Sequence, residues 1–142
     1  MTVRRSRLLL VATVLVVVVG LPLAGKWARQ TPETRCALDG QRIDSCYRVR
    51  IVDDRDRDHE FCSIQCARLW LDSQKLKPRA VLVTDETTGE EIDATAAWFV
   101  RSQVVTQARA ANRIHAFASY DDAQRHARAA WGRVLTGADK PF

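Results

Sequence analysis

Apolar residues follow three patterns along this chain: one continuous run near the N-terminus, short alternating segments, and stretches with helical spacing. Residues 47–52 alternate apolar and polar side chains, which is typical of a half-buried strand. The charged residues 53–60 that follow predict a solvated hairpin tip. The remaining predicted elements are strands at 80–84, 114–118 and 133–135, a hairpin turn at 85–90, and an ambiguous apolar segment at 94–100.

Helical spacing appears twice. Residues 63–73 place Cys66, Leu69 and Trp70 on one stripe, and Ser63 stands where an N-cap is expected. Residues 120–131 predict a second helix, which Gly132 ends. The expected inward-facing residues of the second helix are Ala123, Ala127 and Ala130, and the expected core tryptophans of the chain are Trp70, Trp98 and Trp131.

The continuous apolar run, residues 8–25, follows three arginines at positions 4, 5 and 7. As a helix it reaches about 27 Å, enough to cross the hydrocarbon core of a bilayer. Its exit lacks the spaced small residues of a signal-peptidase site, so we expect residues 1–26 to be an uncleaved anchor; a cleaved signal is the alternative. Because arginines stay on the cytoplasmic side, we predict a single-pass cell-membrane protein whose C-terminal domain lies on the periplasmic side.

Two segments of the outer part resemble each other. The sequence FCSIQCARLW from Phe61 has an echo in FASY from Phe117, followed by an acidic turn and ARAAW. Each segment reads as a strand end, a helix and a further strand, which predicts an α+β fold of two small ββα(β) units. We place these units at about 36–84 and 90–136, in one domain (36–136) between a stalk (27–35) and a tail (137–142).

The charge distribution excludes one class of partner. Residues 1–30 hold five Lys and Arg residues and no acid, so 22 − 5 = 17 basic residues remain against all 17 acids. The basic pI therefore belongs to the predicted anchor, and the outer domain is near neutral. We expect no nucleic-acid binding.

Cysteine, aspartate and histidine supply the candidate chemistry. Cys36 and Asp39 stand in a tight turn with Gly40, while Cys62 and Cys66 are one helical turn apart at a predicted helix start. Three thiolates and one oxygen suit tetrahedral zinc, and two or three thiolates suit Cu(I). We therefore predict a metal site of Cys36, Asp39, Cys62 and Cys66; possible additional ligands are Cys46, His59 and His115.

Disulfide bonds are the main alternative, because cysteines outside the cytoplasm are usually oxidised. Cys36–Cys62 with Cys46–Cys66 is one possible pairing. Among the histidines, His115 in its apolar strand is more often a satisfied half-buried histidine than a ligand. His126, on the polar side of the second helix, is expected to have no special role.

The motif order adds a family resemblance. Cys-x2-Asp-Gly followed by Phe-Cys-Ser-x2-Cys-Ala-x2-Trp resembles the TRASH and YHS metal-binding knuckles. The later segments Glu91–Val100, His115–Ala118, Asp122–Ala127 and Trp131–Leu135 follow the order of the NosL family, accessory proteins of nitrous oxide reductase. The resemblance covers about residues 34–136 and implies paired ββαβ-type units and Cu(I) delivery outside the cytoplasmic membrane. The family's methionine segments are missing, since Met1 is the only methionine.

These observations predict a membrane-anchored, non-enzymatic protein that binds a soft metal, copper(I) before zinc. Its expected partner is a metalloenzyme or copper-transport protein that takes the ion by ligand exchange. The alternatives are a disulfide-stapled interaction domain without metal, a zinc-binding TRASH-like module, and a thiol oxidoreductase that uses Cys62 and Cys66.

Overall fold

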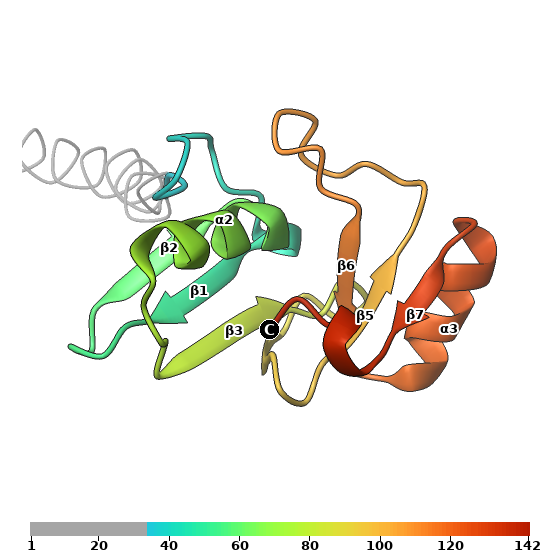
Figure 1. Ribbon diagram of the computed structural model, residues 1–142. Coiled ribbons are helices and arrows are strands. Elements are labelled where there is room, and N and C mark those ends of the chain that lie inside the picture. Colours follow the sequence, from blue (N-terminus) through green and yellow to red (C-terminus); the bar gives the residue numbers. More distant parts are fainter. Residues whose placement is uncertain (1–33) are drawn as a thin grey trace, which may run out of the picture. The chain divides into compact units, whose positions relative to one another are not determined.

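Two antiparallel sheets, each packed against one helix, make up residues 34–142, the part of the chain that the computed structural model describes (Figure 1). The predicted anchor and nearly all of the predicted stalk lie outside these residues. The α+β class is confirmed.

The first sheet has the strand order β2-β1-β3-β4. Its elements in chain order are β1 (Val49–Val52), β2 (Asp58–Phe61), α2 (Ile64–Gln74), β3 (Ala80–Thr84) and β4 (Glu91–Asp93). Strand β1 pairs antiparallel with β2 and β3, so β2 is an edge strand. A short 3-10 helix, η1 (Ser45–Tyr47), leads into β1.

The second sheet repeats this topology with the order β6-β5-β7. Its elements are β5 (Trp98–Arg101), β6 (Ile114–Phe117), α3 (Tyr120–Ala129) and β7 (Arg133–Leu135), followed by η2 (Gly137–Asp139). In both units a hairpin leads into a helix, and the strand after the helix returns beside the first strand. The sequence echo therefore marks two ββαβ units.

The two helix starts agree with the prediction. Ser63 Oγ accepts a hydrogen bond from the Cys66 N–H, and Ser119 Oγ accepts one from the Asp122 N–H. Each serine stands two residues after a phenylalanine that ends a strand, Phe61 or Phe117. A hydroxyl that satisfies an otherwise unpaired amide is a local signal, which is why the sequence located both starts.

Three expectations about boundaries and burial are wrong. Tyr47 lies in η1 and not in a strand, because the Asp44 carboxylate caps the Cys46 N–H and favours a turn. Trp131 is 86% exposed, because the helix ends at Ala129 and a left-handed backbone at Trp131 turns its ring out of the core. Leu69 is also exposed; the stripe that faces the sheet is centred on Cys66 and Ala67 instead.

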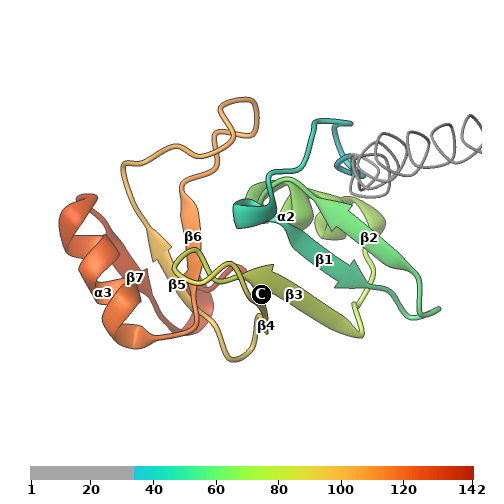
Figure 2. The same ribbon diagram turned by 180° about the vertical axis from the view of Figure 1, so that it is seen from behind.

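One core cluster joins the two units. It combines residues of the first sheet and α2 with Phe99, Ile114, Ala116 and Leu135 of the second sheet. The C-terminus lies between the two sheets in both views, where Phe142 packs 6.1 Å from the Phe99 ring (Figures 1 and 2). The next residue of β5, Val100, belongs to a separate small cluster with Phe117 and α3.

Candidate metal site

Four potential ligands converge beside α2. We call four residues the thiol cluster: Cys36, Asp39, Cys62 and Cys66. Each offers one ligand atom, and these four atoms lie within 4.8 Å of one another. The Sγ atoms of Cys62 and Cys66 are 3.6 Å apart, and Asp39 Oδ2 is 3.6 Å from Cys66 Sγ and 3.8 Å from Cys62 Sγ. The three sulfurs are buried and the carboxylate is exposed, so the cluster has one open side.

A tight turn places Cys36 and Asp39. The Gly40 N–H donates to Cys36 O, and Gly40 has φ +69°, a left-handed conformation that glycine adopts without strain. The Ala37 N–H donates to Glu60 O, which ties the turn to edge strand β2 just before Cys62. Asp39 Oδ1 accepts from the Gln41 N–H, so the carboxylate is oriented by its own turn.

The other two thiols come from the junction of β2 and α2. Cys62 follows the last residue of β2, and Cys66 stands in the first turn of α2, capped by Ser63. Residues four apart lie on one side of a helix turn, which brings the two sulfurs together. The positive end of the helix dipole favours thiolate at this position.

Burial and hydrogen bonding set the proton affinities of the cluster. Burial raises the pKa of the Cys62 and Cys66 thiols, so both are protonated at neutral pH when no metal is bound. Burial alone would raise the pKa of Asp39, but hydrogen bonds from the Gln41 amide and the neighbouring thiols lower it. A soft metal that binds here must therefore displace thiol protons.

The spacing of the sulfurs suits a metal. Zinc–sulfur bonds of about 2.3 Å at tetrahedral angles place two sulfurs about 3.8 Å apart. The observed 3.6 Å between Cys62 and Cys66 is close to that value. Only small adjustments are needed for the sulfurs to share one ion, which lowers the reorganisation that binding requires.

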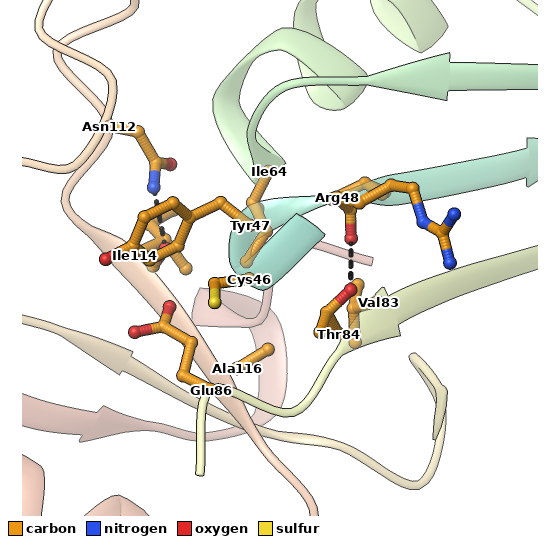
Figure 3. A pocket seen from close by; sticks show the side chains of 11 residues that line it. Cys46, Tyr47, Arg48, Ile64, Val83, Thr84, Glu86, Asn112, Ile114 and Ala116 are labelled. Atoms are coloured by element: carbon orange, nitrogen blue, oxygen red, sulfur yellow. Dashed lines mark hydrogen bonds between the residues drawn. The ribbon is translucent and has the colours of Figure 1, made fainter. Parts of the chain in front are cut away.

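Cys46 lies apart from the cluster. All four cysteines are free thiols, and Cys46 is exposed in η1. Figure 3 shows its sulfur beside Glu86 and Tyr47, in a small pocket that residues from both units line. The structure thus does not bring Cys46 to the other three thiols, and it shows no disulfide among the four cysteines.

His59 is also held elsewhere. Its Nε2 lies 3.1 Å from Asp53 Oδ2, and its ring packs 4.6 Å from Trp70. Asp53 is 1% exposed, although it begins the segment we expected to be a solvated tip. Its carboxylate accepts from the N–H groups of Arg55 and Arg57 and from the Arg57 side chain, which holds the pKa of Asp53 well below its usual range. Asp53 therefore closes the hairpin and orients His59 away from the thiols.

His115 has hydrogen-bond partners, as predicted, but it is fully buried where half-burial was expected. Its Nδ1 lies 2.9 Å from Glu86 Oε2, and its Nε2 lies 3.0 Å from Ser102 Oγ. His126, expected to be unremarkable, packs 4.3 Å from the His115 ring, and its buried Nε2 has no hydrogen-bond partner among residues 34–142. A helix-face pattern could not reveal this burial, because it depends on the fold of β6 beneath α3.

The partly buried His126 predicts an acid sensitivity. Burial lowers its pKa, and His115 lowers it further, so the unfolded chain takes up a proton below about pH 6.5 that the folded chain resists. Stability should fall as pH drops from 7 to 5, by less than the limiting ~1.4 kcal/mol per pH unit for one proton. Urea unfolding at several pH values measures this slope, which H126Q should reduce. An unchanged slope in H126Q would contradict the assignment to His126.

The comparison with protein families decides the relationship. The NosL family profile matches residues 30–141, which is most of the chain. The chain belongs to the NosL family. No curated protein gives a significant match.

A solved NosL structure supports the same fold. The copper chaperone NosL from Shewanella denitrificans is similar to this chain with a TM-score of 0.65 and 19% sequence identity, over 74% of this chain and 87% of that protein. At this identity the likeness shows the fold. Family membership confirms the resemblance predicted from the sequence. Across residues 34–142, none of the helices combines the length and apolar character of a membrane span.

Proposed function

We propose that this NosL-family protein binds one Cu(I) ion through Cys36, Cys62 and Cys66 and hands it to a partner during assembly of a respiratory metalloenzyme. The observation that carries the proposal is the convergence of three buried sulfurs on one point. Sulfur ligands suit Cu(I), and residues 34–142 contain no methionine that could supply a sulfur instead of these cysteines.

Asp39 is the ligand through which exchange would begin. It is exposed, whereas the three cysteines are at most 3% exposed. Carboxylate oxygen is a hard ligand and holds Cu(I) weakly. A thiolate of the partner would first displace the Asp39 carboxylate from the ion. The buried sulfurs would then release the ion one at a time.

Zinc is the second candidate, and Asp39 is the observation that favours it. Three thiolates and one carboxylate oxygen make a closed tetrahedral set of the kind found in structural zinc sites. In that case the metal would stabilise the turn at Cys36 against α2 and would not be passed on.

The place of action follows from the sequence. We propose that the apolar residues 8–25 anchor the chain in the cell membrane and that the metal-binding domain works on the periplasmic side. Proteolysis of sealed spheroplasts tests this arrangement: the domain should be digested from outside. Protection of the domain until lysis would contradict it.

Metal content and transfer test the function. The full chain, purified in detergent and loaded under reducing conditions, should hold one Cu(I) and yield it faster as the concentration of a thiol acceptor rises. D39C should keep the ion but transfer it more slowly, because a fourth sulfur replaces the weak ligand. Preference for zinc over Cu(I) would favour the zinc module, and closed disulfides with no metal would favour the stapled domain.

A further inference from the structure

Three arginines from three parts of the fold line one pocket beside α2. Arg68 comes from α2, Arg101 from the end of β5, and Arg113 from the start of the β6 hairpin arm. Gln65, Ala110, Ala111 and Ile114 complete its walls, and no acidic residue lines it. We call this hollow the arginine pocket.

These three arginines differ from several others in the domain, which have acidic partners. Arg50 in β1, Arg48 just before β1 and Arg79 just before β3 all form ion pairs with acids. Within residues 34–142, no ion pair forms at Arg68, Arg101 or Arg113. Arg113 donates only to the amide oxygen of Gln103, and Arg101 acts at longer range on Asp139, which is already paired with Arg133.

The pocket wall is anchored by a buried side chain. Asn112 is 2% exposed; its Oδ1 accepts from the Gln65 N–H, and its Nδ2 donates to Thr106 Oγ1 and Ile114 O. These bonds clamp the loop between β5 and β6 against the first turn of α2. The loop that precedes Arg113 is thus fixed against α2, and three cationic side chains line one hollow that has no acidic residue in its walls.

We propose that the arginine pocket receives a carboxylate-rich segment of the protein with which this chain exchanges its metal. Guanidinium groups bind carboxylates through paired hydrogen bonds, and three of them in one hollow suit neighbouring acidic side chains. A membrane surface is the poorer match, since lipid-binding patches gather about four to eight unpaired cations.

The position of the pocket links it to the thiol cluster. The first turns of α2 supply Cys66 to the cluster and Gln65 and Arg68 to the pocket. A partner held by its acidic segment would therefore contact the helix that carries Cys66. The inference rests on the proposed function for the identity of the partner, but the pocket itself needs no metal.

Peptide binding to the full chain in its metal-free form tests the inference. A fluorescent glutamate-rich peptide should bind at low salt, and R101Q/R113Q should weaken binding about tenfold. The matched control R55Q/R128Q removes the same charge from exposed arginines outside the pocket and should bind as the parent does. Soluble short-chain phosphatidylglycerol and inorganic phosphate serve as competitors.

Each outcome is decisive for the pocket. Equal losses in both double variants would show a general charge effect and overturn the inference. If phosphatidylglycerol displaces the labelled peptide at a lower concentration than unlabelled glutamate peptide does, the pocket binds a lipid headgroup. If inorganic phosphate by itself displaces the peptide, the pocket binds a free anion. Either result overturns the inference. Since no metal is present, failure here leaves the Cu(I) proposal standing, and failure of Cu(I) binding leaves this result unchanged.

Discussion

Replacing Cys66 with serine is expected to abolish tight Cu(I) binding by the full chain. Cys66 is 2% exposed, and its sulfur lies 3.6 Å from both Cys62 Sγ and Asp39 Oδ2, so it stands at the centre of the proposed ligand set. A serine hydroxyl does not ionise at neutral pH and is a poor ligand for a soft ion. We expect a loss in affinity beyond about 100-fold, the most that removing a group that merely supports a ligand usually costs.

Competition with a calibrated Cu(I) chelator measures this loss. Cys46→Ser is the matched control, because Cys46 is exposed and lies outside the thiol cluster; its affinity should equal that of the parent. Cys66→Ala, which adds no buried hydroxyl, separates loss of a ligand from damage to the fold. Equal losses in the Cys46 and Cys66 variants would sink the assigned ligand set.

Phe99→Ala should destabilise the whole domain by about 3–5 kcal/mol. Phe99 is fully buried, and it belongs to the core cluster that joins the first sheet to the second. Truncating it leaves a cavity in that joint core and removes its contact with Phe142. Since both units share these contacts, we expect one cooperative unfolding transition at a lower urea concentration.

Urea unfolding followed by circular dichroism and by thiol accessibility checks this expectation. Both signals should shift together, because the thiol cluster sits on the same core. Leu69→Ala is the control: Leu69 is 48% exposed, and its loss should change stability by about 0.5 kcal/mol or less. Two separate transitions in Phe99→Ala would show that the units fold independently.

Local chemistry explains what could be read from the sequence. Ser63 and Ser119 marked the helix starts because a cap acts within three residues, and the apolar residues around His115 predicted the strand Ile114–Phe117. The grouping of Cys36, Asp39, Cys62 and Cys66 could be predicted as well. The Cys62–Cys66 spacing is local, and the knuckle motif implies a nearby turn like the one at Cys36.

Longer-range packing explains the errors. Trp131 was expected inside because large aromatic residues usually are, yet one left-handed residue at the helix end put it outside. Asp53 and the Nε2 atom of His126 are buried although both side chains are polar. Asp53 is covered by the closure of its own hairpin, and the His126 ring is covered by His115 and Phe117, which lie in β6. Leu69 fitted a helical stripe, but the residues of α2 that are buried are Ile64, Cys66 and Ala67.

The sequence by itself determined the α+β class, the two repeated units, the family and the four residues of the proposed metal site, because periodicity, caps and motif spacing act over a few residues. Only the tertiary structure decided that Cys46 and His59 lie outside the thiol cluster, that Asp39 is its open side, and that three arginines meet in one pocket. Those facts depend on which faces pack together and in what register. The packing of faces and the register are set by the core that both units share, and a residue's neighbours in sequence do not specify them.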